Sequence, residues 1–252
     1  MTELQLFMQK DKARINGKIY SYYNSFKKFI CCPNLPKFDI RYSNSREDNS
    51  INYKAQILPY QKPIVLRYNI ASINENSDDF KFTLVHEFTH LYDYYILSQK
   101  YDDNFIKRNM QLYSECHAVQ IELLFCYHII DKVTDFADFM KTDVTKILDK
   151  PYEKNELYKD CAINFMKNPS FTSFHYIKTA YMYSYATSLL LSQLLEEDIR
   201  SMNFLEPYSD KMNQITKLLS TLKYTDIPSE DLLVQLGNLD EDLNLMFLSN
   251  NT

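Results

Sequence analysis

Three residues in one short stretch, His86, Glu87 and His90, have the types and spacing of a metal-dependent hydrolytic site. Residues four apart on an α-helix lie about one turn apart and nearly in line, so both imidazoles can reach one metal ion. Glu87 is offset by about 100° around the helix, where its carboxylate could take a proton from a metal-bound water. The pattern His-Glu-x-x-His therefore predicts a zinc site with Glu87 as general base. The plainer alternative is two surface histidines beside a glutamate.

The stretch around the motif favours the metal site. Steps of about 100° per residue place His90 and Asp93 within about 40° of His86. The opposite side of the same helix collects Leu84, Phe88 and Leu91. One face is thus suited to packing in a core, and the other presents two histidines and an acid.

A catalytic zinc needs a third protein ligand besides two histidines. Asp93 shares their face but lies about 10 Å of helical rise beyond His86, too far to join both histidines on one ion. Downstream, Glu115 and His117 are the candidates. On a helix these two are about 200° apart, so only one of them can face the site. Their positions alone do not decide which one.

The histidine pair followed by a glutamate on the next helix resembles the gluzincin metallopeptidases. The segment Glu115-x-x-Ala118, which opens an apolar helix, is similar to small bacterial and phage-associated peptidases of the ImmA/IrrE type. The resemblance covers about residues 50–130. It implies Glu115 as the third zinc ligand and a zincin-like fold, in which an edge strand ahead of the active-site helix binds an extended peptide.

A second resemblance is to the mitochondrial inner-membrane processing peptidase family, through Asp93 three residues after the second histidine and through Ser114-Glu115. The arginine-containing signature that follows the glutamate in that family is missing. Asp93 is expected to accept a hydrogen bond from the free nitrogen of a liganded histidine; the alternative is a solvated acid. A group that stabilises the tetrahedral oxyanion is also expected, and the candidates are His117, His175, Tyr176 and Tyr181.

Apolar spacing and turn residues predict the elements that carry these side chains. A first helix is expected over about residues 11–32, ending before Pro33. Strands are expected at Phe38–Tyr42, Tyr53–Leu58 and Pro63–Ala71, and long helices at about 77–99, with Ser77 as N-cap, and 103–131. Later helices are punctuated by prolines, and Ser229 caps a short one that stops near Gly237.

The predicted fold class is α+β. It is a mostly helical zincin-like fold with a small N-terminal sheet, an active-site helix, a following glutamate helix and a helical C-terminal extension. Residues 1–140 are expected to form the metallopeptidase domain, and residues 141–252 a helical extension packed on it. The two glycines of the 252-residue chain favour helices over strands joined by tight turns.

Composition and charge limit the partners and the cellular location that can be expected. A net charge of −5 gives no basic field for nucleic acid or an anionic membrane. The five cysteines include an adjacent pair and form no CxxC pattern, which favours reduced thiols. Residues 1–12 do not read as a secretory signal, and residues 179–195 read as a buried helix and not as a membrane span. A cytoplasmic location is therefore expected.

The function that these observations predict is a zinc-dependent metalloendopeptidase that cleaves an intracellular protein or peptide by metal-activated water. One alternative is a catalytically silent binding or regulatory module with the same fold, although such a module has no need of Glu87. The other is an exported toxin protease with the same site.

Overall fold

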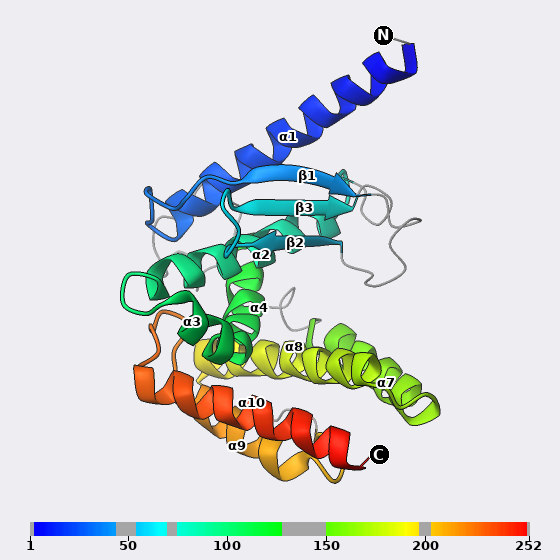
Figure 1. Ribbon diagram of the computed structural model, residues 1–252, viewed down its shortest axis with the longest axis vertical. Coiled ribbons are helices and arrows are strands. Elements are labelled where there is room, and N and C mark those ends of the chain that lie inside the picture. The colour runs from blue at the N-terminus through cyan, green and yellow to red at the C-terminus, as the bar shows by residue number, and fades with distance from the viewer. Residues whose placement is uncertain (1–2, 44–53, 70–74, 128–149, 197–202, 251–252) are drawn as a thin grey trace.

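The computed structural model describes residues 3–43, 54–69, 75–127, 150–196 and 203–250. Within these ranges the chain forms eight helices and one three-stranded sheet, so the fold is α+β and mostly helical, as predicted. Figure 1 shows the sheet and the first helices at one end of the molecule and the later helices stacked at the other.

The sheet follows helix α1 (Glu3–Phe29) and contains β1 (Asp39–Ser43), β2 (Ala55–Leu58) and β3 (Val65–Asn69). Its order is β1-β3-β2, with β1 parallel and β2 antiparallel to β3. All three strands lie within the predicted ranges or one residue beyond them; residues 53, 70 and 71 of those ranges are outside the described residues. Strand β2 therefore forms one edge of the sheet, next to the helix that follows.

Helix α2 (Asp78–Leu97) carries the His-Glu-x-x-His motif and begins after Ser77, as predicted, although the Ser77 side chain makes no capping hydrogen bond. Ten of its residues are buried, including Leu84, Phe88 and Leu91 of the predicted core face. The helix packs against α1, β2 and α4. The histidine face is thereby turned towards α4.

The prediction of a single helix over residues 103–131 is wrong in one respect. The chain forms α3 (Asp103–Asn109) and α4 (Gln111–Tyr127), with a bend at Met110; residues 128–131 are outside the described residues. No glycine or proline marks this bend in the sequence. The backbone tolerates it because Met110 N still donates to Ile106 O and Ser114 N to Met110 O.

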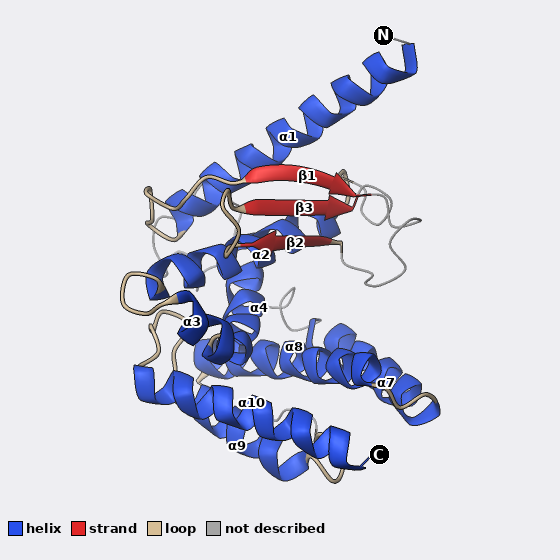
Figure 2. Ribbon diagram, in the orientation of Figure 1, coloured by secondary structure: helices blue, strands red, loops and turns tan. Residues whose placement is uncertain are grey.

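Helix α4 is the central helix of the fold. Every residue from 112 to 126 is buried except Glu115, which is partly exposed. The helix packs against α2 on one side and α8 on another, and Figure 2 shows it between the sheet end and the later helices. A helix that is buried around nearly its whole circumference needs cover on all sides, and this position supplies it.

The C-terminal part is entirely helical where it is described. It contains α7 (Lys150–Lys167), α8 (Phe171–Leu195), α9 (Ser209–Leu219) and α10 (Glu230–Asn250). Helix α8 includes the predicted buried stretch, and its start is fixed by a capping box between Ser170 and Ser173. No described helix is long and apolar enough to cross a membrane.

Gly237 does not end a helix, which corrects the prediction of a short helix there. Helix α10 continues through it to Asn250. A Cβ atom at this position would lie 2.2 Å from Asn109 Oδ1 and 3.0 Å from Arg108 O. The glycine is therefore required by the close approach of α10 to the end of α3, a contact between distant parts of the chain.

Candidate metal centre

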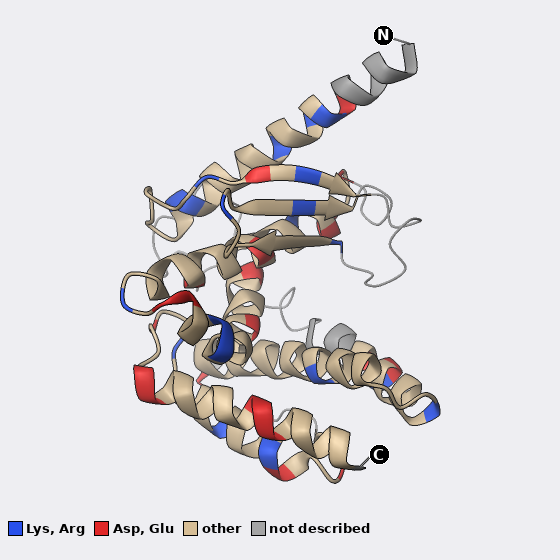
Figure 3. Cartoon of the chain, viewed as in Figure 1, with Lys and Arg blue, Asp and Glu red and all other residues tan. Residues whose placement is uncertain are grey.

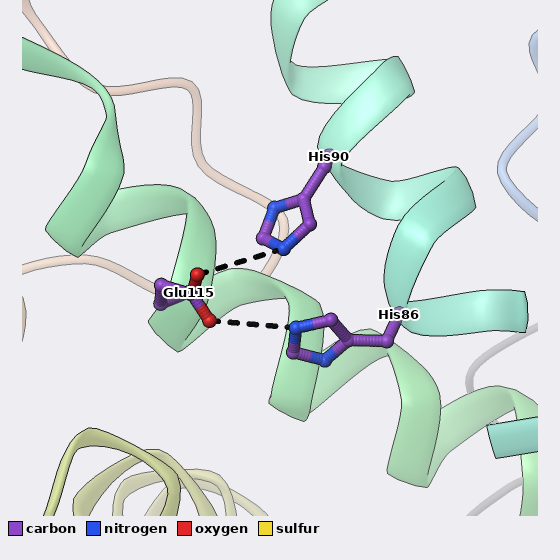
Figure 4. Close-up of side chains that lie close together, drawn as sticks. All are labelled: His86, His90 and Glu115. Atoms are coloured by element: carbon purple, nitrogen blue, oxygen red, sulfur yellow. Dashed lines mark ion pairs between the residues drawn. The ribbon is translucent and has the colours of Figure 1, made fainter. Parts of the chain in front are cut away.

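His86 and His90 of α2 and Glu115 of α4 converge on one point (Figure 4). One donor atom from each of the three lies within 4.8 Å of the other two. His86 Nε2 is 3.4 Å from Glu115 Oε2, and His90 Nε2 is 3.8 Å from Glu115 Oε1. The structure thus brings together the two motif histidines and the downstream glutamate.

These residues fit a bound cation by geometry and by chemistry. Two ligand atoms on a tetrahedral zinc are about 3.4 Å apart, as its bond lengths of about 2.0–2.1 Å require, and the observed separations are close to this. Glu115 Oε2 is buried and makes no well-formed hydrogen bond within the described residues. A buried carboxylate oxygen without such a bond is costly unless a cation faces it. Two imidazoles and a carboxylate are a donor set that zinc accepts.

His86 is oriented by a carboxylate behind it. Its Nδ1 lies 3.0 Å from Glu122 Oε2, and Glu122 is buried. A bond of this kind fixes the tautomer and directs the other nitrogen, Nε2, to the metal position. Glu122 was not among the site residues predicted from the sequence, although it lies seven residues, two helical turns, after Glu115 and so on the same face of α4.

His90 is oriented through a serine. Its Nδ1 lies 2.8 Å from Ser114 Oγ, and that hydroxyl donates to Asp93 Oδ2 at 2.7 Å. Asp93 is 2% exposed, so it is not a solvated acid. The expected direct bond from a liganded histidine to Asp93 is wrong, because Ser114 stands between them. Ser114 precedes Glu115 on α4; in the sequence it served only for a family resemblance, and its contact with His90 was not predicted.

His117 points away from the metal position. Its Nδ1 lies 2.7 Å from Asp93 Oδ1, and its Nε2 lies 3.0 Å from Tyr224 O, in the segment before α10. Burial alone would lower the pKa of His117, but the charge of Asp93 outweighs it and raises the pKa. Of the two candidates for third ligand, Glu115 faces the site, and His117 links α2 and α4 to the C-terminal part.

Glu87 lies beside the ligands and is held by the sheet. Its Oε2 accepts a hydrogen bond of 2.6 Å from the backbone N–H of Ile57 in β2. Burial raises the pKa of Glu87 to about 7, even though the charge of His86 acts in the opposite direction. Because the side chain also lines the cleft, it combines access to the site with a fixed position.

The electrostatics of the ligands favour a cation. Burial would raise the pKa of Glu115, but His86 and His90 lower it to about 2, so the group is a carboxylate. Burial lowers the pKa of His90 to about 4, so its imidazole is neutral near pH 7. Burial lowers the pKa of His86, but the carboxylates of Glu115 and Glu122 outweigh this effect and raise the pKa to about 10. Figure 3 shows acidic segments on α2 and α4, between the level of the sheet and that of α8.

A cleft of about 850 Å³ opens onto the three ligands. Its walls come from β2, α2, α3, α4, α7 and α8. They include the polar side chains of Lys54, Gln56 and Lys107 and the apolar side chains of Phe82, Ile106, Met110, Leu123 and Leu157.

The four candidates for the oxyanion-stabilising group lie in different parts of the structure. Tyr176 lines the cleft, whereas His175, its exposed neighbour, is not among the lining residues. Tyr181 is 2% exposed and packs against Tyr158 and Phe204, so it belongs to the C-terminal core. His117 is likewise outside the cleft.

Another aromatic residue lies beside the ligands and was not among the candidates selected from the sequence. Tyr183 of α8 lines the cleft, and its hydroxyl lies 3.4 Å from His86 Nε2. It stands seven residues after Tyr176, so the two lie on one face of α8 about two turns apart. That spacing was the available signal, but it is one among the many spacings that 21 tyrosines create.

Comparison of the chain with protein-family models, with curated proteins and with solved structures found no match. The site is therefore defined by its own residues: one buried and two partly buried side chains, from two histidines and a glutamate, that could hold a metal ion in a mostly helical α+β fold.

Proposed function

We propose that the protein is a zinc-dependent metalloendopeptidase whose substrate is a protein or peptide. The observation that carries the proposal is the meeting of His86, His90 and Glu115 at one point, with the Glu87 carboxylate beside them in an open cleft. A structural zinc is closed to water and substrate, whereas hydrolysis requires an open position on the ion. The cleft supports the hydrolytic reading.

His86, His90 and Glu115 would hold the ion, which when bound lowers the pKa of a water towards about 7 and polarises a carbonyl group. Glu87 would take the proton of that water and later return it to the leaving amine. Its bond to Ile57 N–H keeps the carboxylate in place for both transfers.

Strand β2 offers a place for an extended peptide. It is an edge strand, and residues 54–57 line the cleft directly beside Glu87. Backbone groups at such an edge can pair with a peptide whatever its sequence, while pockets for alternate side chains supply selectivity. This favours a peptide bond over a small-molecule amide as the bond that is cleaved.

The proposal is tested with the purified protein and its Glu87→Gln variant. We expect about one zinc per chain in both proteins by elemental analysis. Cleavage of a fluorogenic peptide library should fall by at least about 100-fold in the variant, because the general base is removed. Glu156→Gln, on α7 and paired with exposed Lys159, is the matched control and should cleave like the wild type.

Two results would overturn the proposal. One is a native protein that binds no metal, or that keeps its zinc after His90→Ala. The other is peptide cleavage that survives in Glu87→Gln. A protein that binds zinc but cleaves no peptide under any condition would instead support the silent binding module.

A further inference from the structure

A tyrosine from the C-terminal part reaches the metal position. The Tyr183 hydroxyl lies 3.4 Å from His86 Nε2, and the two rings meet edge to face at 5.4 Å between centroids. Burial raises the pKa of Tyr183, and the charges of Glu115, Glu122 and Glu87 act in the same direction. The hydroxyl thus belongs to the same small volume as the ligands.

The nitrogen that Tyr183 approaches is the one that would bind the ion. His86 Nδ1 is engaged by Glu122, so Nε2 is the nitrogen that faces the metal position and would bind the ion. Glu115 Oε2 lies at the same distance, 3.4 Å, from this nitrogen. Two ligand atoms of a tetrahedral zinc are about that far apart, so the spacing between the hydroxyl and Nε2 suits two ligands of one ion.

The position of Tyr183 is well supported by its helix. Its neighbours Met182 and Ser184 are buried. Ser184 Oγ donates to Asn155 of α7, and Thr187 Oγ1 donates to the carbonyl of Tyr183 itself. Since α8 also packs on α4, the helix that carries Glu115, the hydroxyl and the third ligand are positioned against each other by one helix pair.

We propose that Tyr183 is a fourth protein ligand of the metal centre, supplied by α8. The inference rests on the proposed metal site but not on peptide cleavage. Zinc sites with three other protein ligands can expand to five-coordination, so ligation by the Tyr183 oxygen leaves a place for water. The C-terminal helical part then completes the centre and does not merely pack against it.

Copper provides a direct probe of this ligand. Cu²⁺ binds nitrogen and oxygen sites at least as tightly as zinc, and a tyrosine that coordinates it releases its phenolic proton to solvent. The resulting phenolate–copper bond gives a charge-transfer absorption band that imidazole and carboxylate ligands do not produce. The wild-type protein alone therefore reports whether a tyrosine is bound, independently of how any variant folds.

Variants then identify the tyrosine. We expect the band in the copper-loaded wild type, its loss in Tyr183→Phe and its retention in Tyr176→Phe. Tyr176 is the matched control because it lines the same cleft from the same helix, about two turns away. Zinc affinity, measured by competition with a chelator, should fall about tenfold or more in Tyr183→Phe and stay within about twofold of wild type in Tyr176→Phe.

The inference is overturned if wild-type protein that holds one copper per chain at the His90-dependent site shows no such band, or if the band persists in Tyr183→Phe. These results leave the peptidase proposal standing. Conversely, a tyrosine–copper band in a protein that cleaves no peptide would support the fourth ligand and count against the proposed activity. A wild-type chain that binds neither metal would overturn both.

Discussion

The two imidazoles of the metal centre are oriented by different chemistry. Glu122 contacts His86 directly, whereas His90 is held by the neutral hydroxyl of Ser114, which in turn donates to Asp93. Asp93 also contacts His117 Nδ1, so one buried carboxylate is the hydrogen-bond partner of both Ser114 and His117. The orientation of His90 therefore depends on a chain of contacts in which Ser114 is the link that touches the ligand.

Replacing that link should weaken metal binding without removing a ligand. In Ser114→Ala, His90 Nδ1 loses its partner and the Asp93 carboxylate loses a donor. We expect zinc affinity to fall by about tenfold, the lower end of what outer partners of metal ligands contribute. The measurement is competition with a chromophoric chelator.

Ser188→Ala is the control for this prediction. Ser188 is also buried in a helix, but its hydroxyl donates only to the carbonyl of Ser184 within α8. Its zinc affinity should equal that of the wild type. Equal affinities in Ser114→Ala and Ser188→Ala would show that the serine bridge does not position His90.

At the scale of elements, the contact between α3 and α10 depends on one glycine. Gly237 lies where a side chain would meet Asn109, and Asn109 is itself buried and donates to Phe105 O. The nearby Arg108 carbonyl is backbone and cannot move aside cheaply. The requirement for glycine thus comes from a neighbouring helix and not from the local backbone conformation.

Gly237→Ala should therefore destabilise the protein. Alanine favours a helix over glycine by about 1 kcal/mol, but overpacking at this contact costs about 1–3 kcal/mol. We expect the free energy of unfolding in denaturant to fall by up to about 2 kcal/mol.

The same substitution at the other glycine, Gly17→Ala, is expected to have the opposite effect on stability. Gly17 lies in α1, and a Cβ atom there would meet nothing within 4 Å. The same substitution should stabilise the protein by about 0.5–1 kcal/mol through helix propensity alone. If both variants were stabilised alike, the close approach of α10 to α3 would be wrong.

At the scale of the whole molecule, the metal centre joins elements that are far apart in the chain. The three candidate ligands come from α2 and α4, the proposed general base Glu87 is bonded to β2, and His117 reaches Tyr224 O ahead of α10. A bound ion would therefore stabilise contacts on both sides of α4. Because the unfolded chain cannot present this ligand set, binding energy adds to folding stability.

Removing the metal should lower the melting temperature. With free zinc at about 100 times its dissociation constant, the folded state gains about 2.7 kcal/mol, which for a chain of this length corresponds to several degrees. Differential scanning calorimetry with and without a chelator measures the shift. In His90→Ala the chelator should have no effect, and an equal shift in both proteins would place the stabilising ion elsewhere.

Much of this arrangement follows from local patterns that the chain itself contains. The helix around His86 and His90, the three strands before it and the α+β class rest on spacings of two and 3.6 residues, which are properties of the backbone and are visible without tertiary contacts. The offset of Glu87 from the two histidines is likewise a consequence of helical geometry alone.

The tertiary structure decided the remainder, because those residues are selected by distant partners. Helical spacing could not choose between Glu115 and His117; the packing of α4 between α2 and α8 turns the first to the metal position and the second to Tyr224. The bend at Met110 and the continuation of α10 through Gly237 arise in the same way. Tyr183 lies 97 positions from His86, and only the packing of α8 on α4 brings its hydroxyl to the site.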